Sequence, residues 1–346
     1  MYFFGKISYF IGHLFTKIIF CVIVVAKFRG CIMNLDISTN ERIQKLQQLR
    51  ESGEYNVASL EMFDAIKELE MTDRLYSQVE FTKERFYLFL EELLDLTNKK
   101  PGLLEYLKSI RNADVLDNQK MEQENSFLIG LYSQLSRETM MGRLIKYAKS
   151  EKVLTGKDLF SLHTTLLNGT LSEGIGSMRT DNATFVGGHV NGDVYIDYFP
   201  IDYKDIKEAA DKIVDIYNNK LDGELYNNVF LQPFLLHGLL AALQLFKDGN
   251  TRTARVMQHA LLWRMLSSQT EYAFDSPPIF ATRNYFPFRE EYRRRINDLV
   301  TLDNNNSWEN WFIFNLYRIQ DAIVVSSHNI EEMKNFDYVR SLKRDR

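Results

Sequence analysis

The segment Leu243–Gln258 carries residue types that can bind a phosphate group. It begins at the end of an apolar stretch, Pro233–Leu245, that is typical of a buried helix, and it continues through turn-forming residues 248–250 into a second helical pattern. The start of a helix favours anions, because its first N–H groups have no acceptor within the helix and its dipole is positive there. Arg252 and Arg255 are three residues apart on this second helix, so one face can present both guanidinium groups. An ordinary corner between two helices, with solvated arginines, would show the same pattern.

The same segment resembles the signature of the Fic (filamentation induced by cyclic AMP) family, His-x-Phe-x-(Asp/Glu)-Gly-Asn-(Gly/Lys)-Arg-x-x-Arg. The matching residues are Phe246, Asp248, Gly249, Asn250, Arg252 and Arg255. Gln244 stands at the position of the family's His, and Thr251 stands at the Gly/Lys position. The matched spacing predicts a Fic-type fold, whereas the departure at Gln244 affects the residue on which the family's chemistry depends.

Most Fic enzymes transfer AMP from ATP to a Ser, Thr or Tyr hydroxyl of a target protein. By this resemblance Asp248 would bind Mg²⁺, and the phosphates of ATP would contact Gly249, Asn250, Thr251, Arg252 and Arg255. Gln244 occupies the general-base position, but a neutral amide can hydrogen-bond to a hydroxyl without being able to take its proton. Losing a general base typically lowers a rate by about 10²–10⁴. The resemblance therefore implies ATP and Mg²⁺ as ligands, with the usual catalytic base missing.

The neighbouring histidines do not offer a replacement base. His237 lies seven residues before Gln244, and about 10 Å of helix separates two such positions. His259 lies two turns into the following helix, and His163 lies on the predicted helix Lys157–Asn168. All three histidines are expected in the core or at helix contacts.

A β-hairpin is predicted upstream of the signature. Three segments resemble the Fic motifs Gly-x-(Phe/Tyr)-Arg, Val-x-(Ile/Val)-Gly and Tyr-Val-Pro-Pro, namely residues 174–180, 184–188 and 198–201. Residues 190–193 form a turn signal, and Val194, Tyr195 and Ile196 can extend as a strand. In the family this hairpin is a flap whose edge strand holds the target protein by main-chain pairing, a mode that needs no particular sequence. A hairpin that only covers the site is the alternative.

Some Fic proteins also carry an inhibitory helix with the motif (Ser/Thr)-x-x-x-Glu-(Gly/Asn). The nearest match is Lys120–Asn125, in which Glu124 fits and Lys120 replaces Ser or Thr. By the resemblance Glu124 would pair with Arg255 and occupy a guanidinium that a phosphate needs. A solvated helix face is the alternative, because Glu-Asn pairs arise often by chance.

The expected fold is mainly α, a Fic-type helical core with one β-hairpin flap and an N-terminal helical accessory region. The predicted parts are an apolar N-terminal segment (1–32), the helical accessory region (33–120), the Fic-like domain (121–330) and a C-terminal tail (331–346). Helical patterns cover Asn34–Lys100, Leu103–Leu116, Met121–Ser150, Asp202–Asn218 and Arg289–Leu299, and Ser307–Phe314 resembles the closing Trp-rich helix of the family.

The apolar N-terminal segment has several explanations. Its unbroken apolar run, Ile18–Ala26, is half of the roughly 20 residues that a membrane span needs, and Lys17 precedes it. An upstream over-read of the start codon before Met33, a weak membrane anchor and a docked apolar helix all remain open. A membrane is an expected partner only if this segment is genuine, and a cytoplasmic location is expected otherwise.

Composition excludes some classes of protein. The net charge of −4 and the pI near 6.0 over 346 residues give no electrostatic reason to expect nucleic acid as a partner. Cys21 and Cys31 are the only cysteines, so a disulfide framework and a thiolate zinc site are excluded after Met33. The expected partners are a nucleotide and a protein target at the hairpin, with a homodimer left open.

Three hypotheses for the function follow. The first is a nucleotide-binding Fic pseudoenzyme or strongly impaired adenylyltransferase. The second is an active nucleotidyl or phosphoryl transferase with altered chemistry; phosphorylating relatives carry Lys at the Thr251 position and lack Gly249, so the resemblance favours the adenylylating group. The third is a non-catalytic helical interaction protein.

Overall fold

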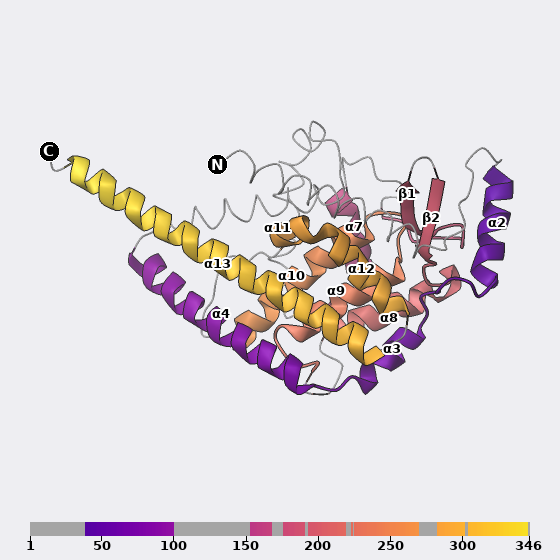
Figure 1. Ribbon diagram of the computed structural model, residues 1–346, viewed down its shortest axis with the longest axis horizontal. Helices are drawn as coiled ribbons and strands as arrows, with labels where there is room; N and C mark the ends of the chain where they lie inside the picture. Colours follow the sequence, from indigo (N-terminus) through magenta and orange to yellow (C-terminus); the bar gives the residue numbers. More distant parts are fainter. Residues whose placement is uncertain are drawn as a thin grey trace, which may run out of the picture. The chain divides into compact units, whose positions relative to one another are not determined.

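The computed structural model describes most of the chain from residue 39 onward (Figure 1). The described residues are 39–99, 153–167, 176–190, 193–218, 223, 225–269, 282–301 and 304–344. They form two compact units, one of residues 39–55 with 185–199 and one of the remaining described residues. The predictions for residues 1–32, for the helices at 103–116 and 121–150, and for Glu124 lie outside the described residues.

Helix α9 (Leu231–Leu243) is the centre of the larger unit. All of its residues are buried, because a helix that is apolar nearly all round is stable only when protein surrounds it. Among the described helices, those that pack closely against it are α8 (Ile206–Tyr217), α10 (Asn250–Gln269), α12 (Arg289–Val300) and α13 (Asn304–Arg344). The predicted pair of helices on either side of the turn at 248–250 is thus confirmed.

Helix α7 (Gly156–Leu167) packs against both α8 and α10. Its apolar residues recur at intervals of three and four, so Leu159, Leu162 and Leu166 are buried along one face. His163 belongs to this buried face. Helix α8 buries one face in the same way, and a short 3₁₀ helix (Tyr203–Asp205) precedes it. Helix α7 thereby brings a histidine to the loop between α9 and α10.

Helix α4 (Asp73–Lys99) runs beside α13 in the larger unit (Figure 1). Gln320 Nε2 donates a buried hydrogen bond to Thr82 Oγ1 at 2.8 Å. The ring of Phe86 meets that of Phe230 edge-on, with 5.7 Å between centroids. Part of the predicted accessory region therefore packs into the same compact unit as α9.

The helical pattern expected across residues 34–100 is interrupted in the structure. Helix α3 spans only Glu61–Ala65 and continues as a 3₁₀ turn at Ile66–Glu68. Residues 52–60 and 69–72 are not helical. The spacing of apolar residues by three and four correctly indicated burial here, since Met62, Phe63 and Ile66 are buried. It did not indicate a long helix.

The C-terminal part of the larger unit is helical. Helix α11 (Thr282–Tyr285) and a 3₁₀ turn (Phe286–Phe288) lead into α12. Helix α13 contains the predicted Trp-rich segment, and Trp308 and Trp311 are buried. It continues to Arg344, so the predicted C-terminal tail from residue 331 extends this helix.

The smaller unit contains helix α2 (Thr39–Glu51) and an antiparallel hairpin of β1 (Val186–Val190) and β2 (Asp193–Tyr198). Gly188 pairs with Tyr195 and Gly187 with Ile196, and the register is irregular between Val186 and Gly187. The hairpin predicted around Val194, Tyr195 and Ile196 is therefore present.

The described chain is mainly helical with one two-stranded hairpin, which confirms the predicted fold class. No helix among the described residues is both long enough and apolar enough to cross a bilayer.

Candidate functional site

Helix α9 ends where the backbone of Gln244 turns into the left-handed region, with φ 54° and ψ 61°. Gln244 is the only residue other than glycine with positive φ in the described part of the chain. Such a conformation costs a residue with a Cβ roughly 1–2 kcal/mol. The side chain turns back on its own helix, because Nε2 donates to the carbonyl of Ala241 at 2.6 Å. Gln244 thus serves as the C-terminal cap of α9.

The buried side chain of Arg179 links this turn to the segment at Ile201 by hydrogen bonds. Its Nε donates to the carbonyl of Gln244 at 2.7 Å, and its Nη2 donates to the carbonyl of Ile201 at 2.5 Å. Main-chain bonds continue the contact, from Arg179 N to Leu245 O at 3.1 Å and from Ile201 N to Leu243 O at 3.3 Å. The sequence placed Arg179 in a segment that resembles a Fic motif but did not predict its role. Its position in that motif was the one feature that could have indicated a role.

The side chain of Asn250 holds the loop closed. Oδ1 accepts from Phe246 N at 2.8 Å, and Nδ2 donates to Phe246 O at 2.9 Å. Both functional atoms of the amide are thus used within the loop, and Asn250 is only 4% exposed. Contact of this side chain with a phosphate stays a prediction. Its two bonds to Phe246 give it a structural role in the loop.

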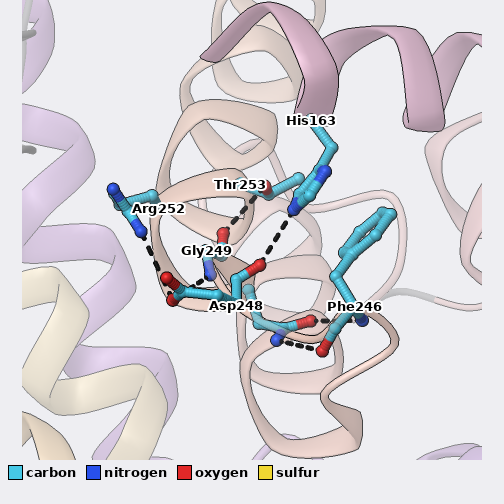
Figure 2. A network of polar contacts seen from close by, with 7 residues as sticks. His163, Phe246, Asp248, Gly249, Arg252 and Thr253 are labelled. Atoms are coloured by element: carbon cyan, nitrogen blue, oxygen red, sulfur yellow. Dashed lines mark hydrogen bonds and ion pairs between the residues drawn. The ribbon is translucent and has the colours of Figure 1, made fainter. Parts of the chain in front are cut away.

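His163 reaches the loop from helix α7 (Figure 2). Its ring lies parallel to that of Phe246, with 3.8 Å between centroids and 8° between planes. Nε2 lies 2.9 Å from the carbonyl oxygen of Asp248, and Nδ1 accepts from Gly176 N at 3.0 Å. Burial lowers the pKa of His163 from its ordinary value, and the contacts with Asp248 oppose this shift only in part. The histidine expected to be structural therefore contacts the candidate site directly.

Asp248 is the exposed carboxylate of the loop. Its side chain is 47% exposed, and Oδ1 accepts from Gly249 N at 2.5 Å and from Arg252 Nη2 at 3.3 Å. Gly249 has φ 75°, and a Cβ there would lie 2.3 Å from Leu167 Cδ1. Glycine is needed at this position both for the backbone conformation and for the approach of α7.

A magnesium ion fits this arrangement only with a nucleotide present. Mg²⁺ commonly takes one or two carboxylates from a protein and fills its other positions with water and substrate phosphates. Asp248 can supply one such carboxylate. No group of three or more candidate metal ligands occurs among the described residues, so an all-protein metal cage is not seen there.

The two arginines of the signature have different surroundings. Arg252 is 2% exposed and contacts Asp248, whereas Arg255 is 1% exposed and contacts Tyr292 on α12. The Arg255 guanidinium donates from Nη1 to the Tyr292 hydroxyl at 3.4 Å and lies 5.7 Å from the centre of that ring. Phosphate binding by Arg255 would have to include or replace this contact.

A buried chain of hydrogen bonds continues from Tyr292 into the core. Because Arg255 can only donate, the Tyr292 hydroxyl has its proton available for Nε2 of His237, 2.8 Å away. His237 then carries its proton on Nδ1, which is bonded to Oε1 of Gln258. Burial and the charge of Arg255 hold the pKa of His237 well below its usual value. His237 is therefore a neutral structural residue, as expected.

The same chain extends to α13 through Tyr285. Gln258 Nε2 donates to the Tyr285 hydroxyl at 3.3 Å, and that hydroxyl donates to Asn315 Oδ1. Burial raises the pKa of Tyr285. His259 lies nearby on α10, and burial followed by the charge of Arg255 lowers its pKa to about 4. The sequence did not indicate any of these contacts, because the residues of the hydrogen-bond chain come from five different helices.

The structure brings most of the predicted site residues together. Asp248, Gly249, Asn250, Thr251 and Arg252 form the loop and the first turn of α10, directly after Gln244. Thr251 is half-buried there. The predicted docking residues Val194, Tyr195 and Ile196 lie on β2 in the other compact unit.

Residues 153–262 match the model of the Fic/DOC family. The chain therefore contains a Fic/DOC domain, as the resemblance in its sequence predicted, and the loop between α9 and α10 lies within that domain.

Several solved structures are similar to this chain. A Fic family protein from Desulfovibrio desulfuricans G20 aligns over 74% of this chain and 74% of its own, with 15% identity and a TM-score of 0.49. Fic-1 from C. elegans aligns over 74% of each chain, with 16% identity and a TM-score of 0.45. A Fic domain containing signaling protein from Bacteroides thetaiotaomicron VPI-5482 aligns over 74% of this chain and 97% of its own, with 18% identity and a TM-score of 0.42. No curated protein matches the sequence.

Proposed function

We propose that this protein binds ATP with Mg²⁺ at the loop between α9 and α10 and transfers AMP to a hydroxyl only very slowly or not at all. One observation carries the proposal: the family's catalytic His is replaced by Gln244, whose amide caps helix α9 through Ala241. An amide has no basic lone pair for a hydroxyl proton near neutral pH. The protein would then act as a nucleotide-dependent binder or regulator.

The nucleotide-binding part of the proposal is supported by the start of helix α10. A helix N-terminus attracts phosphate through its dipole and its first N–H groups. Gly249 permits the backbone conformation from which this helix starts, and Arg252 adds a positive charge in its first turn. A bound Mg²⁺ would neutralise phosphate charge, and Asp248 is the half-exposed carboxylate that would hold it.

The three histidines close to the signature in the sequence or in the fold do not take the place of the missing base. His237 and His259 are buried in the core, at 0% and 4% exposure. Both ring nitrogens of His163 are engaged, one by Gly176 and one by Asp248. A general base must lie within hydrogen-bond reach of the proton it removes. The surroundings of these three histidines therefore agree with impaired transfer.

A protein target is proposed to pair with the hairpin. The sheet has two strands in the described part of the chain, so an added strand would extend it at an edge. Main-chain pairing would align a target hydroxyl without a specific target sequence. In an impaired enzyme the same pairing would hold a partner without modifying it.

The test uses the full-length chain and Q244H, with Q244N as the matched control. Asn and His both tolerate the left-handed conformation of residue 244 better than most residues, so the three proteins should fold alike. We expect Mg²⁺-dependent ATP binding by all three proteins in calorimetry, and AMP incorporation from labelled ATP by Q244H alone, at least about 100-fold above the others.

Other outcomes would select the other hypotheses. Labelled product from the unmodified chain with any nucleotide donor would mean an active transferase with altered chemistry. Failure of ATP and Mg²⁺ to shift the unfolding temperature would mean a non-catalytic interaction protein, because a ligand at about 100 times its Kd adds about 2.7 kcal/mol of stability.

A further inference from the structure

The two nitrogens of His163 have fixed and different roles. The N–H of Gly176 can only donate, so Nδ1 of His163 must be unprotonated where it accepts this bond at 3.0 Å. The carbonyl of Asp248 can only accept, so Nε2 carries the proton that it donates at 2.9 Å. The hydrogen-bond partners therefore assign one neutral tautomer, with the proton on Nε2.

The ring of His163 also fixes the loop by packing. It stacks on the ring of Phe246. The backbone N–H and C=O of Phe246 are both hydrogen-bonded to the side chain of Asn250. His163 is fully buried on α7, so its ring cannot swing into solvent. One side chain thus touches the start of the loop at Phe246 and the middle of the loop at Asp248 (Figure 2). The same side chain also accepts from the segment at Gly176.

Asp248 is held through its main chain while its carboxylate stays half-exposed. The direction of the carboxylate depends on the orientation of this peptide group, because a side chain projects from the backbone that carries it. The Gly249 N–H belongs to the same peptide group as the Asp248 carbonyl, and it donates to Asp248 Oδ1. Fixing the Asp248 carbonyl therefore fixes both the carboxylate and the backbone at the entry to helix α10.

We propose that His163, in the neutral form protonated on Nε2, is a positioning residue that aims the Asp248 carboxylate at Mg²⁺ and thereby sets the affinity for the Mg²⁺ complex of ATP. The inference rests on the proposed function, since it concerns the same loop. In this role His163 acts through the backbone of Asp248, to which its Nε2 donates, and not as a ligand of the metal.

Three variants separate the contacts of His163. H163F keeps a flat ring of similar size over Phe246 and removes both hydrogen bonds. H163Q restores a donor and an acceptor about as far apart as the two ring nitrogens, because its amide carries both groups. H328F changes an exposed histidine on α13 and is the matched control.

The first measurement is calorimetric binding of ATP with Mg²⁺ and of ATP with a chelator. We expect H163F to weaken binding at least tenfold with Mg²⁺ and by clearly less without it, whereas H163Q recovers part of the loss and H328F matches the unmodified chain. A purely structural role would weaken both forms of ATP equally. Equal weakening, or unchanged binding by H163F, overturns the proposal.

The second measurement is hydrogen exchange of the protein without nucleotide. We expect the amide of Gly176 and those of residues 246–253 to exchange at least tenfold faster in H163F, with α12 unchanged. If the unmodified chain fails to bind ATP, the proposed function is refuted, and slower or unchanged exchange in H163F would separately refute the role of His163. If H163F does not fold, the same two measurements on H163Q decide, with intermediate losses expected.

Discussion

The amide of Asn250 bonds both main-chain polar atoms of Phe246, at 2.8 Å to the nitrogen and 2.9 Å to the oxygen. Lys247, Asp248 and Gly249 lie between these two residues in the loop. The asparagine of the signature thus replaces the helical hydrogen bonds that the backbone of Phe246 lacks after α9 has ended.

Replacing this asparagine should destabilise the protein even without any nucleotide. N250A would leave the buried N–H and C=O of Phe246 without their partners, and each such group costs about 1–3 kcal/mol. We expect urea unfolding to show a loss of about 2–4 kcal/mol. N227A, at an exposed asparagine before α9, is the control and should stay within about 0.5 kcal/mol. Equal urea midpoints of unfolding for N250A and N227A would contradict the stabilising role of the bonds from Asn250 to the Phe246 backbone.

Gly249 and Gly53 have the same backbone conformation in different surroundings. Their φ values are 75° and 74°, but a Cβ at 249 would meet Leu167 Cδ1 at 2.3 Å, while one at 53 has nothing within 4 Å. G53A should therefore cost only the conformational strain, roughly 1–2 kcal/mol, and G249A about 1–3 kcal/mol more. Denaturant unfolding measures both losses. A double variant with L167A should lose less than the sum of the single losses, because removing the leucine side chain removes the clash.

The turn and its neighbouring helices could be predicted from the sequence because their determinants are local. The apolar stretch before Leu245, the Gly at 249 and the polar residues after it define an end, a turn and a start within a short span. The left-handed conformation of Gln244 could not be predicted, because nothing in a glutamine indicates it. It accompanies contacts from distant residues, since Arg179 bonds the carbonyl of Gln244 and Asn250 bonds the backbone of Phe246.

The partners of the buried polar residues could not be predicted either. Tyr292 and His237 are 55 residues apart, and their contact depends on how α12 packs on α9. Similarly, the segment around Val57 was expected to be helical because its apolar spacing resembled that of a helix, yet α3 is short. Apolar spacing predicts burial more reliably than it predicts the length of a helix when loops also pack into the core.

The buried histidines should make stability fall as the pH is lowered. The pKa values of His163, His237 and His259 are all lowered by folding, that of His259 to about 4. The unfolded chain therefore takes up protons first, below about pH 6.5, so the free energy of unfolding is highest above that pH and declines below it. His259 alone should contribute a loss of about 3 kcal/mol by about pH 4.

Urea unfolding at several values between about pH 7 and about pH 4.5 checks this decline. In H259Q the slope of stability against pH should be smaller by up to one proton, about 1.4 kcal/mol per pH unit. A flat profile for the unmodified chain over this range would mean that the histidines are not held neutral by burial.

Tyr292 should support Arg255 and His237 through its hydroxyl rather than through its ring. Y292F keeps the aromatic face 5.7 Å from the Arg255 guanidinium, and it removes the group that accepts from Arg255 and lies 2.8 Å from His237 Nε2. Since His237 is fully buried, its ring nitrogen would lose this partner without gaining water. We expect a loss of about 1–3 kcal/mol in urea unfolding. Y317F, at an exposed tyrosine of α13, is the control and should change stability by less than about 0.5 kcal/mol. If Y292F is as stable as Y317F, the hydrogen-bond chain behind Arg255 contributes nothing to the fold.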